Sequence, residues 1–263
     1  LVEPPKTEQM CGPYSEDFER RITLVHTPAG TLRSTYLAGL KGQPGMPEEH
    51  LIGSVEDAEK YLSLPVPGIG GDVRSFFECN AALGDRGIVD VDLGFNPAGT
   101  VAELMGSSTF AGFSIEHRDL LHALIQQRLD HMLALVDFLL ARGVGPYFST
   151  LGEEYITPPL HGPQDFHDFN VRYDRSIADR IRNAGGLLHV HCHGSLKAVL
   201  PMFIELGADV LHPLEPPPLG DVPARLAKEV LRDKVCIEGN LQIGDMYTCD
   251  EETIRAQVEA LIQ

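Results

Sequence analysis

From about residue 86 the chain alternates between short apolar runs and amphipathic helical segments. We predict strands at 87–93, 146–151, 187–193, 209–214 and 235–238. Between them we predict helices at 116–142, 163–183, 196–206 and 222–232, and a last helix from about residue 250 to the end. This order is typical of parallel strands joined by right-handed crossovers, in an open sheet or in a closed barrel. Because no glycine-rich dinucleotide fingerprint follows an early strand, we favour a closed α/β barrel.

The first 85 residues have a different pattern, in which Gly and Pro are frequent and helical periodicity is sparse. Two apolar runs at 22–26 and 31–36 flank a Pro-Ala-Gly turn and predict a β-hairpin. Ser54 precedes a short amphipathic segment that ends at Leu62, so we predict a helix there with Ser54 as its N-cap. We expect this irregular part to belong to a single domain over residues 1–263.

The charge balance restricts the partners that the protein can bind. The formal net charge is -17, which repels phosphate backbones and anionic lipids. We therefore expect a small-molecule substrate and no nucleic-acid or membrane partner. The oligomeric state is left open, a homodimer included.

Two further features concern the surroundings of the chain. No apolar run approaches the roughly 20 residues that span a bilayer, and the five cysteines have no disulfide spacing. We expect free thiols in the reducing cytoplasm. The chain begins with Leu and ends within a helical pattern, so we expect further structure at both ends.

The strand predicted at 187–193 carries histidines at alternate positions. Side chains alternate along a strand, so His189, His191 and His193 share one face, whereas Cys192 points toward the outer helices. His191 and His193 are nearest the carboxyl end, where parallel α/β folds place their active sites. Two imidazoles so placed can share a metal ion, and zinc is the usual one. The alternative is a polar barrel lining without metal, which is the role that we expect for the deeper His189.

Polar residues follow the next two predicted strands. Glu215 comes just after the strand at 209–214, where a carboxylate can be a third metal ligand or an acid/base. Glu238 and Asn240 share a face at the end of the strand at 235–238. We predict a catalytic role for Glu238, and hydrogen bonds to substrate or to a histidine for Asn240.

The two earlier predicted strands also end in acidic residues. Glu153, Glu154 and Tyr155 follow the strand at 146–151, and of the two carboxylates we favour Glu154 for proton transfer. Tyr155 and Asp92 are candidate substrate-binding residues, although Asp92 is equally suited to hold the loop that follows it. A nucleophile elbow and a phosphate-binding loop are both absent from the sequence, which argues against serine hydrolases and nucleotide hydrolases.

Several of these segments together resemble the uroporphyrinogen decarboxylase superfamily. They are Pro158–Phe166, Gly185–Gly194, Leu206–Leu211 and Glu238–Leu241, in that order along residues 85 to 263. The resemblance implies a (β/α)8 barrel. It also implies one of two activities, because the superfamily contains decarboxylases and methyltransferases.

The decarboxylases proper use neither metal nor cofactor, and they hold a porphyrinogen through an N-terminal arginine-rich segment and an aspartate. In this chain Arg20 and Arg21 do not lie in such a motif. The acidic charge balance also disfavours a polycarboxylate substrate. Uroporphyrinogen decarboxylation in porphyrin biosynthesis is therefore the alternative function.

The cobalamin-dependent methyltransferases are the branch that the chain resembles more. Their His-x-Cys-Gly strand end binds zinc together with a later cysteine, and here His191 to Gly194 fits that frame with His193 in place of the cysteine. The later cysteine would fall beyond residue 263, and Cys249 is too early, so Glu215 is the candidate replacement.

This resemblance implies zinc-dependent methyl transfer between a corrinoid such as methylcobalamin and a thiol, a folate or a methoxylated compound. A corrinoid protein is then a candidate partner. A barrel that only binds a small ligand or a corrinoid, without catalysis, is a second alternative.

Overall fold

The computed structural model describes residues 5–239 and 241–262. The chain groups into two compact units, one made of Leu1–Gly70 and Thr100–His131 and the other of Gly71–Gly99 and Met132–Gln263. Helices α3 (Pro97–Met105) and α5 (Arg118–Leu140) each contribute residues to both units. This division differs from the change of pattern near residue 85, and the assignment of one domain to the whole chain stays a prediction.

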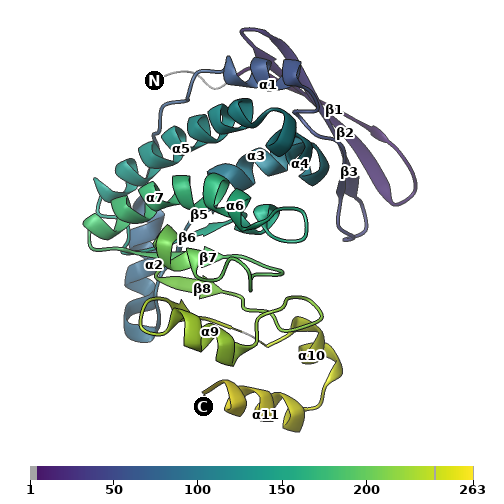
Figure 1. Cartoon of the computed structure of the whole chain (residues 1–263). Helices are drawn as coiled ribbons and strands as arrows, with labels where there is room; N and C mark the ends of the chain where they lie inside the picture. Colours follow the sequence, from purple (N-terminus) through teal and green to yellow (C-terminus); the bar gives the residue numbers. More distant parts are fainter. Residues whose placement is uncertain (1–4, 240, 263) are drawn as a thin grey trace. The chain divides into compact units, whose positions relative to one another are not determined.

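The first unit contains an antiparallel sheet with the strand order β1-β2-β3-β4 (Figure 1). The strands are β1 (Thr7–Pro13), β2 (Phe18–Thr27), β3 (Gly30–Gly39) and β4 (Met46–Glu49). Strands β2 and β3 form the predicted hairpin, which is longer than the apolar runs because its turn pairs Thr27 with Gly30. The sequence pattern gave no indication of β1 and β4, whose residues are almost all exposed.

Two helices lie wholly within this unit, α1 (Val55–Leu62) and α4 (Ser107–Glu116). The predicted cap of α1 is confirmed, because the Ser54 side chain accepts a hydrogen bond from the backbone N–H of Asp57 at 3.2 Å. The inner side of α1 buries Ala58 and Tyr61, and the helix packs on β3.

The second unit is built on a parallel sheet whose strands run in chain order, β5-β6-β7-β8-β9. They are β5 (Val91–Phe95), β6 (Tyr147–Leu151), β7 (Leu187–His191), β8 (Val210–His212) and β9 (Cys236–Ile237). All five predicted strands are confirmed, and together they establish an α/β fold with a parallel sheet. The observed strands are shorter than predicted, and β7 ends at His191 rather than at His193.

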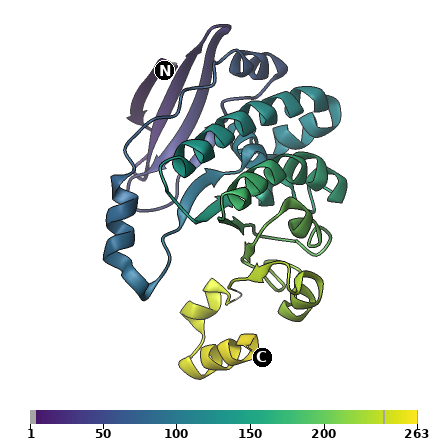
Figure 2. The same cartoon turned by 90° about the vertical axis from the view of Figure 1, so that its left-hand side faces the viewer.

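The helices of this unit are α2 (Arg74–Leu83), α6 (Pro163–Phe166), α7 (Arg172–Asn183), α8 (Met202–Leu206), α9 (Ala224–Leu231), α10 (Ile243–Thr248) and α11 (Glu251–Ile262). The short turns are η1 (Gly84–Arg86), η2 (Glu153–Ile156) and the π-helical η3 (His167–Val171). Figure 2 shows α7 and α9 on the same side of the parallel sheet. The buried face of the sheet includes Phe148, Val190 and Leu211, and α7 packs on β7.

Two helix predictions are corrected. The helix predicted at 163–183 is a run of α6, η3 and α7, so its middle is a π-helical turn. The helix predicted at 196–206 begins only at Met202, because Pro201 has no N–H to continue a helix from the preceding turn. Its predicted end at Gly207 is confirmed, with a left-handed φ of 97°.

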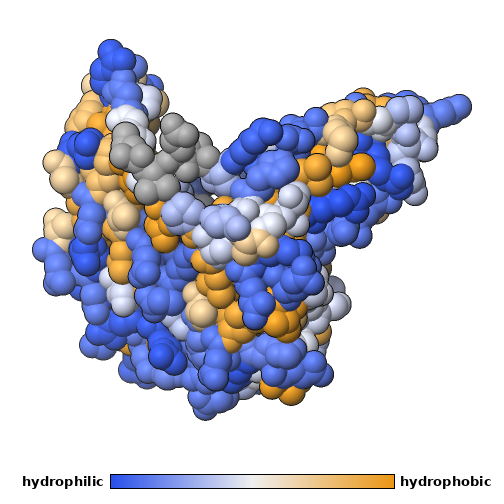
Figure 3. All heavy atoms as spheres, turned by 90° about the horizontal axis from the view of Figure 1, so that it is seen from above, coloured by the Kyte–Doolittle hydropathy of each residue, from blue (hydrophilic) through white to orange (hydrophobic). Residues whose placement is uncertain are grey.

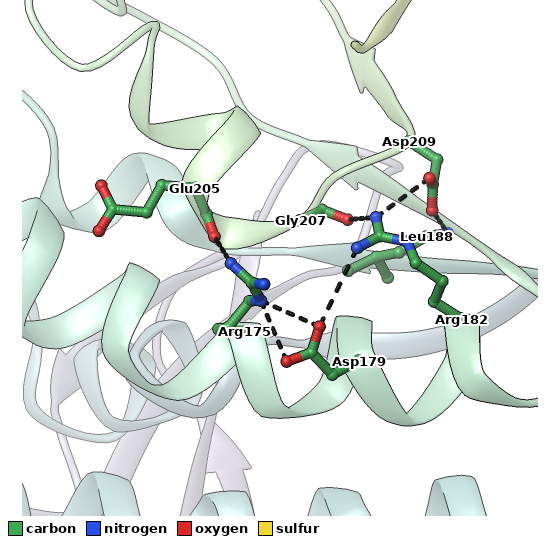
Figure 4. Close-up of polar contacts among 7 residues, drawn as sticks. All are labelled: Arg175, Asp179, Arg182, Leu188, Glu205, Gly207 and Asp209. Atoms are coloured by element: carbon green, nitrogen blue, oxygen red, sulfur yellow. Dashed lines mark hydrogen bonds and ion pairs between the residues drawn. The ribbon is translucent and has the colours of Figure 1, made fainter.

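An arginine–aspartate network fastens α7 to the strands beside it (Figure 4). Arg182 donates to the carbonyl oxygen of Gly207 at 2.7 Å and to Asp209 at 3.2 Å. The other carboxylate oxygen of Asp209 accepts the backbone N–H of Leu188 at 2.9 Å. Asp209 therefore joins the beginnings of β7 and β8 to the end of α7.

Hydrophilic residues cover most of the face seen in Figure 3, with hydrophobic residues between them, in keeping with the acidic composition. Within the described part of the chain, each helix is too short or too polar to cross a membrane.

We predict that Asp209→Ala destabilises the protein, because it leaves the N–H of Leu188 and the guanidinium of Arg182 without their shared acceptor. The free energy of unfolding, measured by urea denaturation at pH 7, should fall by about 1–3 kcal/mol. The exposed Asp233 serves as the matched control, and Asp233→Ala should change it by less than about 0.5 kcal/mol. Equal effects of the two substitutions would contradict the bridging role of Asp209.

Candidate functional site

The register of the parallel strands brings two histidines from different strands side by side. Leu151, His191 and His212 are successive partners across β6, β7 and β8, at the carboxyl ends of these strands. His189 lies one row deeper, between Ser149 and Val210. Because residues two apart share a face, both rows belong to the face of the sheet that does not pack on the helices.

His191 and His212 form the closest contact of the cluster. Their Nδ1 atoms lie 2.9 Å apart, so one ring donates a hydrogen bond to the other. Burial, followed by the neighbouring histidines, lowers the pKa of His191. Burial and the neighbouring His189 and His193 also lower the pKa of His212, although Glu238 opposes them. Both shifts favour the neutral imidazole, which is the form that can bind a metal.

Sequence reasoning missed His212. Its position within the run 209–214 was clear, and alternation places it on the same face as Val210. The sequence does not show the register between β7 and β8, and this register places His212, and not Val210, beside His191.

His193 lies past the end of β7, where it contacts Glu215. Its Nδ1 is 3.1 Å from Oε2 of Glu215, and the same oxygen accepts the backbone N–H of Gly194 at 3.1 Å. Although the strand has ended, the ring centroids of His191 and His193 are 4.6 Å apart. The two histidines therefore lie close together as predicted, although His193 belongs to the turn after the strand and not to the strand itself. Cys192 between them is buried, as expected.

His189 and Glu238 form a second, deeper pair. Nε2 of His189 is 3.6 Å from Oε2 of Glu238, and neither ring nitrogen has a hydrogen-bond partner among the described residues. The side chain of His189 is 12% exposed and that of Glu238 is 55% exposed. Glu238, predicted to be catalytic, therefore contacts His189, while Asn240 lies outside the described residues.

The acidic turn after β6 faces the same cluster. Glu154 is half-buried, and its carboxylate accepts the backbone N–H of Gly152 at 3.0 Å. Burial raises the pKa of Glu154, and hydrogen bonds from backbone N–H groups and, to a smaller extent, the nearby His193 oppose that shift. Glu154 and His193 are therefore close enough to interact electrostatically.

Of the two predicted substrate-binding residues, Asp92 lies near the start of β5 and not at its carboxyl end, because the strand runs from Val91 to Phe95, and Tyr155 lies beside the same strand. The ring of Tyr155 packs at 6.0 Å from that of Phe95. Asp92 accepts a hydrogen bond from the backbone N–H of Gly94 at 2.7 Å. This contact holds the backbone that follows Asp92, which is the alternative role predicted for it. The roles of both residues toward a substrate stay predictions.

A buried polar network lies behind the turn. Asn96 donates through Nδ2 to Asn170 at 3.0 Å and to Asp174 at 2.7 Å. Asn170 donates to the carbonyl oxygen of Glu153 at 3.1 Å, and Thr150 donates to the Glu153 carboxylate at 3.0 Å. All five side chains are buried. The network therefore joins the ends of β5 and β6 to η3 and α7.

Two glycines allow this close approach. Gly152 has a φ of 107°, and a Cβ there would lie 2.8 Å from Cδ1 of Phe95 and 3.1 Å from the Cα of Gly99. Only glycine fits such a position without strain. The turn that carries Glu154 is thus held both by the close packing of its backbone at Gly152 and by the hydrogen bonds of the buried network.

Both carboxyls of the network favour the protonated form. Burial raises the pKa of Asp174 to about 8, against the hydrogen bond from Asn96. Burial, together with the charge of Asp174, raises the pKa of Glu153 well above its usual range. Sequence reasoning preferred Glu154 over Glu153 and so missed this network, whose other members come from segments far apart in the chain.

Among the described residues, no three His, Cys, Asp or Glu side chains converge as a complete set of metal ligands. Two imidazoles nevertheless lie side by side, since the ring centroids of His191 and His193 are 4.6 Å apart. His191 and His193 each engage Nδ1 with a neighbour, which leaves Nε2 as the nitrogen for a ligand. Two histidines are fewer than the three protein ligands that a zinc site usually has, so a zinc ion here would need a further ligand from outside this pair.

We predict that Asp174→Asn reduces the loss of folding stability that accompanies a rise in pH. The folded pKa of about 8 exceeds the unfolded one, so above pH 4 the folded protein keeps a proton that the unfolded chain has lost. The free energy of unfolding therefore falls as the pH rises from 4 to 8. In Asp174→Asn the amide oxygen can still accept the hydrogen bond from Asn96, and the free energy of unfolding should fall less over this range. The variant should therefore be more stable than the wild type at pH 8 by on the order of a few kcal/mol.

The measurement is urea denaturation at pH 5 and pH 8. Asp179→Asn, at an exposed position on the same helix, controls for loss of a charge and should retain the slope of the wild type. Parallel pH dependences for Asp174→Asn and the wild type would show that Asp174 is ionised in the folded protein.

Comparison with known proteins gives the family and the fold. The family model for uroporphyrinogen decarboxylase (URO-D) matches residues 95–263. No curated protein gives a significant match. A solved methyltransferase from Methanosarcina mazei superposes with a TM-score of 0.56 at 15% identity, over 77% of this chain and 58% of that one. The chain thus spans little more than half the length of that structure, and the likeness is one of fold.

A second solved structure is too dissimilar to inform the fold. It is a dipeptide epimerase from Methylococcus capsulatus complexed with Mg ion, with a TM-score of 0.14 at 12% identity, over 78% of this chain and 86% of that one. The family match, by contrast, covers more than half of the chain and includes β6 to β9 and the whole histidine cluster. The chain therefore belongs to the uroporphyrinogen decarboxylase (URO-D) family.

Proposed function

We propose that the protein transfers a methyl group between a corrinoid, such as methylcobalamin, and an acceptor or donor that is a thiol, a folate or a methoxylated compound. The observation that carries this proposal is the paired arrangement of His191 and His193, each with Nδ1 engaged and Nε2 left for a ligand. Similarity in fold to a methyltransferase supports it. A corrinoid protein is the proposed partner.

Zinc is the proposed metal, with His191 and His193 as its ligands. When bound, zinc lowers the pKa of a thiol acceptor and so supplies a thiolate near neutral pH. We assign to Glu154 the uptake of the thiol proton, because burial raises the pKa of its carboxyl group above that of an exposed glutamate. In this reaction the methyl group leaves cobalt for sulfur, and the Co–C electron pair stays on cobalt as cob(I)alamin.

We propose that the parallel sheet is part of a closed (β/α)8 barrel. Its strands follow one another without the reversal of order that defines doubly wound sheets. Right-handed crossovers in such an order place every connecting helix on one face. The other face, which carries the histidines, then becomes the inside of the barrel, with the cluster at the carboxyl-end mouth where barrel enzymes act.

Decarboxylation of uroporphyrinogen is the second candidate, because the matching family model bears that name. The arginine pair in the first unit gives it no support. Arg20 is held by Glu48 at 2.6 Å and Arg21 by Glu19 at 2.8 Å, so both charges are already neutralised.

We predict that the protein demethylates methylcobalamin when zinc and a thiol such as 2-mercaptoethanol are present, which is measured as the change in the visible spectrum of the corrinoid. His191→Ala combined with His193→Ala should lower the rate at least tenfold, since each substitution removes a proposed zinc ligand. His167→Ala, at an exposed position in the same unit, should leave the rate unchanged. Tetrahydrofolate and a methoxylated aromatic compound are tested in the same way.

Three outcomes would overturn this proposal. Conversion of uroporphyrinogen to a decarboxylated porphyrinogen would assign the protein to the decarboxylases. Binding of methylcobalamin without loss of its methyl group to any of these acceptors would indicate a binding protein. A rate that is insensitive to the double histidine variant would place the reaction elsewhere.

A further inference from the structure

The buried network behind the acidic turn contains two carboxyl groups that the proposed reaction does not use. We propose that Glu153 and Asp174 form a proton-dependent latch, which holds the turn η2 against η3 and α7 while both carboxyls are protonated and releases the turn when they lose protons. The latch thereby controls the placement of Glu154 and Tyr155, which are half-buried in the same turn. This inference goes beyond the proposed methyl transfer and does not rest on it, because it requires neither zinc nor a corrinoid.

Two carboxyl oxygens of the network are buried without a partner. Oε2 of Glu153 and Oδ1 of Asp174 have no hydrogen-bond partner among the described residues, and both residues are buried. The other oxygen of each carboxyl accepts one hydrogen bond, from Thr150 at 3.0 Å and from Asn96 at 2.7 Å respectively. An ionised carboxylate in a protein interior requires several donors or a cation. With one donor each, the two groups fit their surroundings as neutral acids.

The titratable groups that surround the pair are themselves acidic. Burial raises the pKa of Glu153, and the charges of Asp174 on α7 and of Glu154 in the turn add to this shift. Burial also raises the pKa of the Cys192 thiol after β7, and the same carboxyls add to that shift. Among the described residues, the groups that act on the pKa values of Glu153 and Asp174 include no cation. A negative charge on either carboxyl is therefore not neutralised where it lies.

The turn η2 is the segment that must move for Glu153 to reach water. It is joined to η3 by the hydrogen bond from Asn170 to the carbonyl oxygen of Glu153 at 3.1 Å. Within the turn, Tyr155 donates its N–H to the carbonyl oxygen of Gly152 at 3.2 Å, and the Glu154 carboxylate accepts the N–H of Gly152 at 3.0 Å. Hydration of the Glu153 carboxyl therefore separates the turn from η3, and Glu154 and Tyr155 move with it.

Release of the turn is coupled to the loss of protons. In the released form the carboxyls are hydrated and have ordinary pKa values, whereas in the closed form burial raises the pKa of Asp174 to about 8. The pKa of Glu153 is raised in the same direction, chiefly by burial. Between about pH 5 and pH 8 the closed form therefore holds protons that the released form has lost. By linkage, the released fraction rises with pH by about tenfold per pH unit for each of these protons.

Infrared spectroscopy tests whether the folded protein contains buried neutral carboxyls at pH 7. The wild type should show the carbonyl stretch of protonated carboxylic acids, which lies apart from the bands of carboxylates and amides. Glu153→Gln and Asp174→Asn should each remove part of this signal, whereas Asp179→Asn, at an exposed position on α7, should leave it unchanged. Absence of the band from the wild type at pH 7 would overturn the latch, whether or not the variants fold.

Amide hydrogen exchange of residues 150–157 measures the release of the turn between about pH 5 and pH 8. After correction for the intrinsic exchange rate, the opening constant of the wild type should rise at least about tenfold per pH unit. Glu153→Gln combined with Asp174→Asn should remove most of this dependence, because neither side chain then titrates. Residues 187–191, which form β7, are the internal control. An equal rise there would mean that the whole unit unfolds, and it would overturn the latch.

A tryptophan in the turn reports the same release by fluorescence. The chain contains no tryptophan, so Tyr155→Trp introduces a single emitter beside Glu154. Its emission should shift to longer wavelength as the pH rises, because the indole becomes hydrated, and it should not shift when Glu153→Gln and Asp174→Asn are also present. The same shift in that background would assign the pH dependence to a neighbour such as His193, and emission that is independent of pH in Tyr155→Trp alone would show that the turn stays closed. Either result would overturn the latch, whereas release without methyl transfer would overturn only the proposed function.

Discussion

The parallel register between β7 and β8 is the constraint on which the candidate site depends. It makes His191 and His212 partners, so that their Nδ1 atoms meet at 2.9 Å at the carboxyl ends of two strands. A shift of one residue would turn the histidines of one strand toward the packed face of the sheet. The register is in turn supported by Asp209, which ties the beginnings of both strands to α7 through Arg182 (Figure 4).

Around this pair the site is assembled in two layers. The outer layer consists of the turn after β7, which carries His193, and of Glu215, which contacts both His193 and the backbone N–H of Gly194. The second layer is the buried carboxyl network of Glu153 and Asp174, which fixes the turn that carries Glu154. Burying two carboxyls costs stability as the pH rises, and such a cost is commonly retained where the geometry of a functional site requires it.

The sequence was informative wherever the signal was local. Alternating apolar runs located all five parallel strands, and alternation along 187–193 identified the functional face of β7. It failed where the answer depends on contacts between distant segments. His212 could not be paired with His191 without the register, and Glu153 could not be preferred over Glu154 without Asn96, Asn170 and Asp174. Strand lengths were overestimated because an apolar run does not show where pairing with its neighbour stops.

We propose that zinc binds at the carboxyl ends of these strands through His191 and His193. X-ray absorption at the zinc edge, on protein purified without chelators, tests it most directly. We expect one zinc per chain, with at least two nitrogen ligands at about 2.0–2.1 Å. Folded protein that contains no zinc and takes up none, or zinc without histidine nitrogens among its ligands, would contradict it.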